Sequence, residues 1–358
     1  MPPMPLPEGV AGSFAKQEKS CERLGSPFTA ALCGLITAKG LPHGPVHDRL
    51  AGWSGNLAPV GDALPLRLTG ALHSLVLEGR DPELAAVYPP TEAAKDVLAE
   101  AVFGAVTRHG EFIAQFLDSP PQTNETARSA VLLPAFLWLA KRCGLPLAVS
   151  EIGSSAGLNQ NWHRYRYDYG SWTWGDENSP VVLPCEWRGG TPPAPVPVTV
   201  AESAGCDIAP IPIDREEDRL RLRSYVWADQ TTRLDRLNGA LRIAKDFPPQ
   251  VETADAGRFL AGRLNMPRTG HLHVIFHTIM WQYMPAAEQG AVAALIKDAG
   301  TRATAYAPLA WLRFEPDGKP DGAALSVTLW NGDSADGETL PLGRGDYHGR
   351  WIDWAPAG

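Results

Sequence analysis

The residues with the clearest chemical potential lie in the sequence VSEIGSSAGLN, at positions 149–159. Glu151 closes a short apolar run, and a cluster of small residues follows it. Small residues let a backbone approach a ligand closely, and N–H groups at a helix start can bind an anionic group. The pattern predicts a strand, a ligand-binding turn and a helix. The predicted binding residues are Glu151, Gly153, Ser154, Ser155, Ala156, Gly157 and Asn159.

Taken as G-x-S-x-G, the same cluster fits a nucleophile elbow, in which Ser155 would attack an acyl group. A catalytic triad would also need a histidine and an acid, for which His277 or His348, with Asp346, are candidates. The residues before the cluster show helical periodicity, whereas a hydrolase of this kind has several strands before its elbow. A tight turn whose glycines serve only packing is a third interpretation.

Taken as E-x-G-x-x-x-G, the cluster resembles the first motif of class I S-adenosylmethionine-dependent methyltransferases, with Ser155 in place of the middle glycine. The resemblance implies an acid after each of the next two strands. Asp207, in GCDIAP, would contact the ribose, and Asp255, in VETADA, would lie near the adenine. The spacing of Gly153 and Gly157 does not fit the dinucleotide pattern G-x-G-x-x-G.

Four further residues are candidates for acid–base or substrate contacts. His277 ends the apolar run HVIFH, and the carboxyl end of a strand opens toward the ligand crevice of an α/β sheet. It could serve as a base, or be a hydrogen-bonded core histidine. Asn124, Glu125 and Arg128 could contact a substrate from one helix start, with Asn124 as its N-cap, or could simply stabilise that helix. No spacing predicts a metal site.

These elements imply a protein in two parts. Apolar residues recur at helical spacing at 26–38, 64–77, 92–116 and 125–143, so residues 1–145 are predicted to form a helical N-terminal region. From residue 146, strand-like and helix-like stretches alternate, which is typical of a parallel sheet covered by helices. The predicted strands are 147–152, 198–201, 206–213, 250–254, 271–278 and 303–314, with 324–330 and 347–354 as a closing pair. The predicted fold class is α/β, with a Rossmann-like, doubly wound, methyltransferase-like sheet at 146–358.

An insertion at 162–197 separates Glu151 from Asp207. It is rich in aromatic residues, which could line a substrate pocket or pack a hairpin over the sheet. These residues are Trp162, Tyr165, Tyr167, Tyr169, Trp172, Trp174 and Trp187.

The composition of the chain indicates which kinds of binding partner to expect. The net charge of −8 argues against sequence-independent nucleic-acid binding, which needs a basic surface. Five widely spaced cysteines without a C-x-x-C pair favour reduced thiols in a cytoplasmic protein. The longest apolar run, 131–140, is shorter than the roughly 20 residues that span a bilayer, so no membrane partner is expected. The sequence does not indicate an oligomeric state.

From about residue 26 to residue 354 the chain resembles a bacterial family, domain of unknown function 2332, through phrases such as QTNE, GSSAGLN, GCDIAPI and YHGRW. The resemblance implies a methyltransferase-like core without an established reaction. We therefore expect an S-adenosylmethionine-dependent methyltransferase acting on a small or medium organic substrate. A serine hydrolase using Ser155 and a non-catalytic nucleotide- or metabolite-binding protein are the alternatives.

Overall fold

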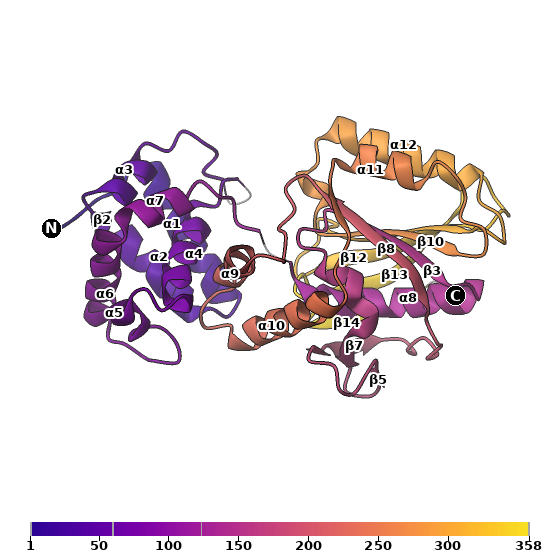
Figure 1. The fold of residues 1–358 in the computed structure, drawn as a ribbon, viewed down its shortest axis with the longest axis horizontal. Helices are drawn as coiled ribbons and strands as arrows, with labels where there is room; N and C mark the ends of the chain where they lie inside the picture. The colour runs from indigo at the N-terminus through magenta and orange to yellow at the C-terminus, as the bar shows by residue number, and fades with distance from the viewer. Residues whose placement is uncertain (1, 59–60, 123, 357–358) are drawn as a thin grey trace. The chain divides into compact units, whose positions relative to one another are not determined.

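The chain folds into two units that are interleaved along the sequence. The computed structural model describes residues 2–58, 61–122 and 124–356. Residues 1–123 and 214–235 form a helical unit, and residues 124–213 and 236–358 form a sheet unit. Figure 1 shows the elements of both units.

This division differs from the predicted boundary at residue 145 in two respects. Helix α8 (Ser129–Cys143) belongs to the sheet unit, because its Phe136 packs edge-on against Phe276 of the sheet, with 5.7 Å between the ring centroids. Helix α9 (Glu216–Ser224) returns to the helical unit, where the neighbouring Tyr225 packs against Phe116. The sequence pattern shows that these segments are helical, but not which core they join.

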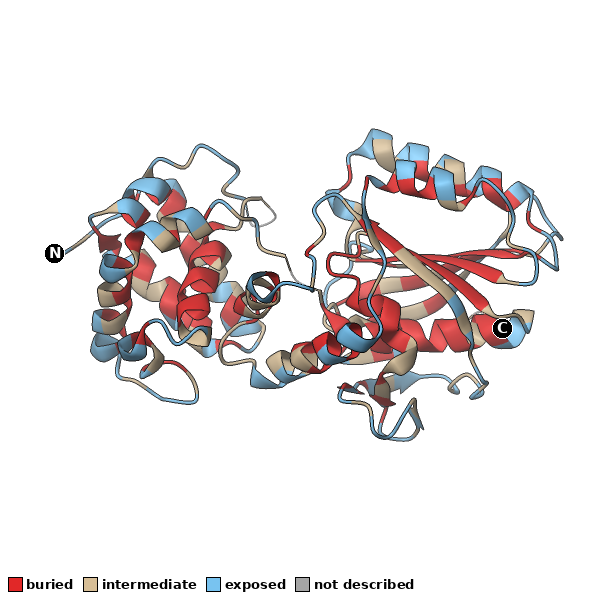
Figure 2. Cartoon of the chain, in the orientation of Figure 1, coloured by how far each residue is buried: buried red, intermediate tan, exposed pale blue. Residues whose placement is uncertain are grey.

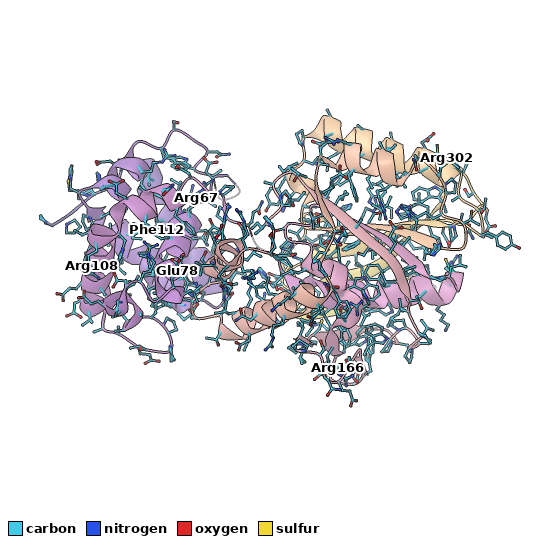
Figure 3. The ribbon with its side chains drawn as sticks, in the orientation of Figure 1. Arg67, Glu78, Arg108, Phe112, Arg166 and Arg302 are labelled. Atoms are coloured by element: carbon cyan, nitrogen blue, oxygen red, sulfur yellow. The ribbon has the colours of Figure 1, made fainter. Side chains whose placement is uncertain are left out.

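The helical unit is built around fully buried apolar side chains such as Phe14, Leu68 and Leu72. Two predicted helices are found nearly unchanged, and the predicted helix 92–116 is interrupted at His109, whose backbone leaves the helical region. Arg108 of α6, which is labelled in Figure 3, pairs with Asp81, the cap of α5, at 2.8 Å. The helices of the helical unit are α1 (Glu8–Arg23), α2 (Pro27–Lys39), α3 (Pro45–Ala51), α4 (Leu64–Leu77), α5 (Pro82–Ala85), α6 (Lys95–Arg108), α7 (Gly110–Phe116) and α9. A short pair of strands, β1 (Pro3–Met4) and β2 (Leu41–Pro42), is also present.

The sheet unit contains a large mixed sheet, so the predicted α/β class is confirmed at that level. The strand order is β7-β14-β13-β12-β11-β10-β3-β8-β9. The strands from β11 to β9 are mutually parallel, and β12, β13 and β14 are each antiparallel to the preceding strand. The main-sheet strands are β3 (Leu147–Ile152), β7 (Glu186–Gly189), β8 (Val200–Asp207), β9 (Val251–Thr253), β10 (Leu272–Thr278), β11 (Leu309–Glu315), β12 (Ala323–Trp330), β13 (Glu338–Gly345) and β14 (Trp351–Trp354).

The chain order of the parallel strands reverses at the centre of the sheet. From β3 the chain proceeds outward to β8 and β9, and it then returns to the other side of β3 to form β10 and β11. The crevice at such a reversal, outside the carboxyl ends of the strands, is where ligands bind in open α/β sheets. The loops after β3, β8 and β10 therefore define the region in which a site is expected.

Helices cover both faces of this sheet. Ile275 packs with Val292 of α12 (Ala286–Thr301), whereas the next residue, Phe276, packs against α8. Successive residues of a strand point to opposite faces, so α12 and α8 lie on opposite sides, as Figure 1 shows. The central strands are buried throughout (Figure 2). The remaining helices are α10 (Thr231–Asp246), which crosses from one unit to the other, and α11 (Ala256–Arg263).

The predicted strands differ from the structure in three places. The separate stretches predicted at 198–201 and 206–213 are replaced by one strand, β8, which covers 200–207 and leaves 208–213 outside any strand. The predicted strand at 303–314 begins later, as β11. The predicted closing strands at 324–330 and 347–354 do not pair with each other, because β13 lies between β12 and β14. The sequence does not indicate β13, because this strand contains polar residues, Pro341 and two glycines.

Candidate functional site

The loop after β3 has an unusual backbone. Gly153, Ser155 and Gly157 all have positive φ, at 68°, 54° and 72°. Left-handed backbone is accessible to glycine and costly for serine. The N–H of Ser154 donates to the carbonyl of Cys206 at 3.0 Å, which folds the loop against the end of β8. The loop leads into η2 (Leu158–Arg164), a 3-10 helix in place of the predicted helix start.

Asp207, the last residue of β8, is part of the same arrangement. Its Oδ2 accepts a hydrogen bond from the backbone N–H of Ser155 at 2.8 Å, and its Oδ1 accepts one from Ala209 at 2.9 Å. The phrases GSSAGLN and GCDIAPI, which are about 50 residues apart in the sequence, are thus directly bonded. The structure brings these two groups of predicted cofactor residues together.

Glu151 lies beneath this loop and is almost completely buried, with 3% of its surface exposed. Among the described residues, its Oε2 atom has no hydrogen-bond partner. Burial, together with the nearby charge of Asp207, raises the pKa of this carboxyl well above 4.5, although a hydrogen bond from Asn159 and the charge of Arg128 oppose the shift. A buried carboxylate of this kind would be stabilised by a cationic group of a ligand.

The segment that leads into α8 packs directly on the loop. Asn124 Oδ1 accepts a hydrogen bond from the N–H of Leu158 at 2.7 Å, so its predicted role as an N-cap is wrong. Glu125 is the cap, because its side chain accepts a hydrogen bond from Ala127 at the start of η1 (Thr126–Arg128). Asn159 receives a hydrogen bond from Ser129 at 2.9 Å, which connects η2 to the first residue of α8.

A tight turn at 346–350 closes this edge of the sheet unit. Arg128 Nε donates to the carbonyl of Tyr347 at 3.0 Å, and its Nη1 donates to Thr278, the last residue of β10, at 3.4 Å. A Cβ on Gly349 would lie only 2.0 Å from the carbonyl oxygen of Ala127, so the turn packs against η1 with no space for a side chain. His348, in the middle of this turn, places Nδ1 3.5 Å from Oε2 of Glu125.

Residues 11–354 match the model of the family DUF2332, which is described as "Uncharacterized protein conserved in bacteria". The chain belongs to this family. No match was found among curated proteins or among solved structures.

The four phrases through which the sequence resembles this family lie together at the carboxyl end of β3. QTNE supplies Asn124 and Glu125, GSSAGLN forms the loop, GCDIAPI supplies Asp207, and YHGRW forms the turn that carries His348. Within QTNE, Thr123 lies outside the described residues. In this chain the four phrases therefore form one connected polar cluster in the sheet unit.

The predicted base, His277, lies on the other face of the sheet. Glu151 pairs in register with Phe276, so the adjacent His277 points to the opposite side, toward Trp311. Its Nε2 accepts a hydrogen bond from the Trp311 indole at 3.0 Å, and its Nδ1 lies 2.6 Å from Oε1 of Glu315. Proton transfer to Nε2 would therefore require the Trp311 hydrogen bond to break.

Asp255 caps a helix in the structure. Its side chain accepts a hydrogen bond from the N–H of Arg258 at 2.8 Å, at the start of α11. The N–H of the preceding residue, Ala254, donates to the carbonyl of Asp207 at 3.1 Å. The ends of β8 and β9 are thus adjacent, and contact between Asp255 and an adenine stays a prediction.

The aromatic insertion forms packed structure. Its strands β4 (Arg166–Asp168), β5 (Thr173–Trp174) and β6 (Val182–Pro184) make a small sheet, in which Tyr167 and Trp174 are cross-strand partners. Trp162 stacks on Phe136 of α8 at 4.1 Å between ring centroids. Trp162, Tyr165 and Tyr167 are fully buried, which favours the interpretation of the insertion as packing over the sheet rather than as an open aromatic pocket.

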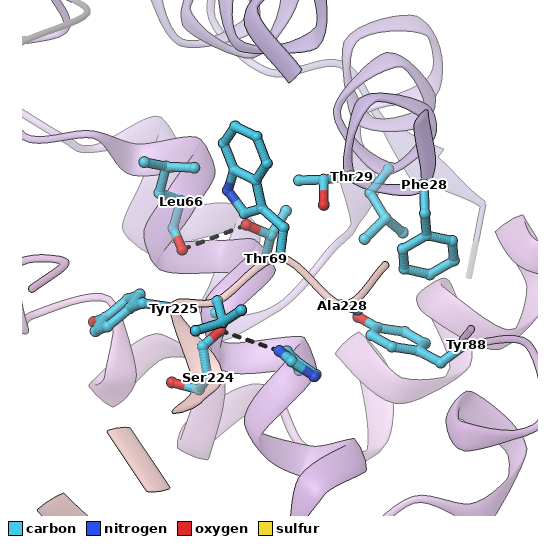
Figure 4. A pocket seen from close by; sticks show the side chains of 13 residues that line it. Phe28, Thr29, Leu66, Thr69, Tyr88, Ser224, Tyr225 and Ala228 are labelled. Atoms are coloured by element: carbon cyan, nitrogen blue, oxygen red, sulfur yellow. Dashed lines mark hydrogen bonds between the residues drawn. The ribbon is translucent and has the colours of Figure 1, made fainter. Parts of the chain in front are cut away.

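A separate cavity lies within the helical unit, between α2, α4 and the segment 224–228 (Figure 4). His73 lies 3.3 Å from the carbonyl of Ser224, and the buried hydroxyl of Tyr88 has no partner among the described residues. None of the sequence-predicted site residues lines this cavity.

The described residues contain no group of three or more His, Cys, Asp or Glu side chains arranged to hold a metal ion. None of their helices has the length and apolar character needed to cross a membrane.

Proposed function

We propose that the sheet unit binds S-adenosylmethionine at the carboxyl end of β3 and transfers its methyl group to a small or medium organic acceptor. The order β9-β8-β3-β10-β11 supports this proposal, since it has the 3-2-1-4-5 arrangement of a Rossmann-like, doubly wound sheet. The loop 153–157 lies after the first of these strands, at the reversal of strand order, which is where such sheets bind a cofactor.

The observation that carries the proposal is the buried carboxylate of Glu151. It lies under a glycine-containing loop, retains an oxygen without a partner among the described residues, and is close enough to Asp207 for the two charges to repel. Unsatisfied buried polar atoms are rare in native proteins and call for an explanation such as an absent ligand. The positively charged ammonium and sulfonium groups of S-adenosylmethionine match a site with two carboxylates.

Other residues of the chain would divide the remaining contacts. The loop backbone from Gly153 to Gly157 would approach the methionine part of the cofactor, and Asp207 would hold the ribose by exchanging its bond to Ser155 for one to a hydroxyl group. Asp255 would lie near the adenine. When bound, the cofactor supplies an electrophilic methyl group, and the protein has to orient the acceptor and exclude water.

The serine-hydrolase alternative has one feature in its favour. Ser155 has the strained, left-handed backbone that a nucleophile elbow requires. However, the described residues offer no hydrogen-bond partner to its Oγ, whereas a triad needs a histidine there. His277 is bonded to Trp311 and Glu315 instead. Non-catalytic binding of the same cofactor is the other alternative.

Calorimetry on the full chain tests the proposal. S-Adenosylmethionine and its demethylated product should both bind, and Glu151→Gln should weaken binding of the cationic cofactor more than binding of the neutral thioether product. A matched control is Glu252→Gln, which alters an exposed acid on β9. Absence of binding at millimolar cofactor would reject the proposal, and labelling by a fluorophosphonate that is lost in Ser155→Ala would favour the hydrolase.

A further inference from the structure

The ring of His348 has one buried edge and one accessible edge. Its Nδ1 atom is buried and lies 3.5 Å from Oε2 of Glu125, whereas 34% of the side chain as a whole is exposed. Nε2 forms no hydrogen bond with the described residues and is not one of their buried unpartnered atoms, so it lies at the accessible edge of the ring. This orientation presents one ring nitrogen to an acid and the other to the surroundings of the site.

Glu125 is fixed where an orienting acid has to be. Its side chain is 2% exposed, and its Oε1 accepts a hydrogen bond from the N–H of Ala127 at 3.2 Å. A carboxylate beside Nδ1 favours the tautomer with its proton on Nδ1, which leaves the lone pair on Nε2. An acid that faces Nδ1, here at 3.5 Å and without a hydrogen bond to it, and a lone pair on Nε2 together resemble the arrangement of a histidine general base.

The turn that carries His348 is held on both sides by charged groups. Asp346 accepts hydrogen bonds from the N–H of His348 at 2.9 Å and from the guanidinium of Arg350 at 2.7 Å. Arg128 donates to the carbonyl of Tyr347. The charges around the imidazole are therefore Glu125, Asp346, Arg128 and Arg350, and the last pairs with Asp346.

The same contacts connect this histidine with the proposed cofactor site. Asn159 Nδ2 donates to the backbone carbonyl of Glu125 at 3.5 Å, and the side chain of Asn159 also bonds to Glu151. Arg128 joins the turn to the end of β10. In contrast, the lone pair of His277 is already occupied by Trp311, on the other face of the sheet.

We propose that His348, oriented by Glu125, is the proton acceptor for methyl transfer to a hydroxyl group; this inference rests on the proposed function. The acceptor oxygen forms a bond to the methyl carbon as the carbon–sulfur bond breaks. The electron pair of that bond stays on sulfur, which becomes a neutral thioether, and the hydroxyl proton passes to Nε2 of His348. The substrate class is thus an alcohol or a phenol.

A first test needs neither cofactor nor acceptor. Imidazole ¹⁵N NMR spectra of the full chain above neutral pH should show His348 with its proton on Nδ1, with His348→Gln identifying the signal. Glu125→Gln should shift the ring toward the Nε2–H tautomer, because the orienting charge is lost. A wild-type His348 with its proton on Nε2 would overturn the inference.

A second test measures transfer from S-adenosylmethionine to a panel of alcohols and phenols. His348→Ala should lower the rate by about 100-fold or more, the usual contribution of a general base, with cofactor affinity unchanged. Added imidazole should restore part of the rate, since the missing ring is accessible. The control His271→Ala alters a histidine that precedes β10, at the opposite end of the strand, and should retain the wild-type rate.

The outcomes separate the two proposals. Failure of the wild-type chain to bind the cofactor would overturn the proposed function. Cofactor binding combined with an undiminished rate in His348→Ala, or with transfer to no hydroxyl acceptor in the panel, would overturn only the role of His348.

Discussion

Asp207 Oδ2 accepts a hydrogen bond from the backbone N–H of Ser155 at 2.8 Å, which ties the end of β8 to the loop after β3. The other oxygen of the same carboxylate holds the N–H of Ala209 at 2.9 Å. One side chain therefore fixes two turns at the reversal of strand order. A residue in this position affects both the stability of the loop and its readiness to bind a ligand.

Replacing Asp207 with Ala should impair both properties. The N–H of Ser155, which is partly buried, and that of Ala209, which is exposed, would lose this acceptor. The main cost is that of Ser155, since an unsatisfied buried donor costs about 1–3 kcal/mol. We expect the free energy of unfolding to fall by that amount in urea titrations, and S-adenosylmethionine affinity to fall at least about tenfold, equivalent to about 1.4 kcal/mol. Glu252→Ala removes an exposed acid from the adjacent strand. Equal effects of the two changes would contradict this role of Asp207.

Ser155→Gly should be tolerated, although it changes the centre of the site. Ser155 has φ +54°, and its buried Oγ has no partner among the described residues. Glycine relieves a strain of about 1 kcal/mol or more, which offsets its larger entropy loss on folding. We expect an unfolding free energy equal to or above that of the wild type, with cofactor binding retained. Loss of cofactor binding without loss of stability would show that the Ser155 hydroxyl itself contacts the cofactor.

Gly157→Ala provides the contrasting variant. Its φ is +72°, and a Cβ would lie 2.6 Å from Cγ2 of Val251 and 2.7 Å from Cβ of Pro249. Backbone strain and this overlap should destabilise the sheet unit by about 1–3 kcal/mol, as measured by urea unfolding. A neutral result would mean that the loop can move away from β9.

The sequence determines the position of the loop better than the position of the bases around it. The largely apolar run 147–152 lies between Pro146 and Gly153, so the sequence predicts the bounds of β3 as the structure has them. The partners of His277 come from β11, at Trp311 and Glu315, and no local pattern encodes them. Likewise, Asn124 is of a residue type that often caps helices, but its side chain accepts a hydrogen bond from the N–H of Leu158, 34 residues away, instead.

The acid that lies beside His348 could not be predicted from the sequence either. In the sequence it was a candidate only for the triad of the hydrolase alternative, because Asp346 is two residues away. The structure places a different acid, Glu125, beside its ring, and uses Asp346 to hold the turn. The phrases QTNE and YHGRW contain both partners, but only the fold shows that the phrases meet.

The difference in stability between Glu151→Gln and the wild type should depend on pH in a definite direction. Because burial raises the pKa of Glu151 above 4.5, the folded state holds this proton where the unfolded state releases it. Wild-type stability therefore decreases as pH rises above that value, and the decrease ends once the folded-state pKa is passed. Glutamine cannot ionise, so the variant should be more stable than the wild type at neutral pH. Urea unfolding between about pH 4 and pH 8 measures the difference, which should disappear at the acidic end. A constant difference would contradict the shift.

The aromatic insertion should contribute mainly to stability, and Trp162 offers a direct measurement. Its ring is fully buried and stacks on Phe136, whereas its Nε1 has no partner among the described residues. Trp162→Ala should cost about 3–5 kcal/mol, the usual effect of deleting a large buried ring. Trp162→Phe keeps a stacked ring and removes the unsatisfied N–H, so we expect a smaller loss.

Trp138→Ala is the control, since this ring on α8 is only partly buried and lies near Arg142. Urea unfolding should be monitored by circular dichroism, because these substitutions remove a tryptophan and would change a fluorescence signal. Equal losses for Trp162→Ala and Trp138→Ala would show that the insertion is loosely packed, and an aromatic substrate pocket would then become the better explanation of its composition.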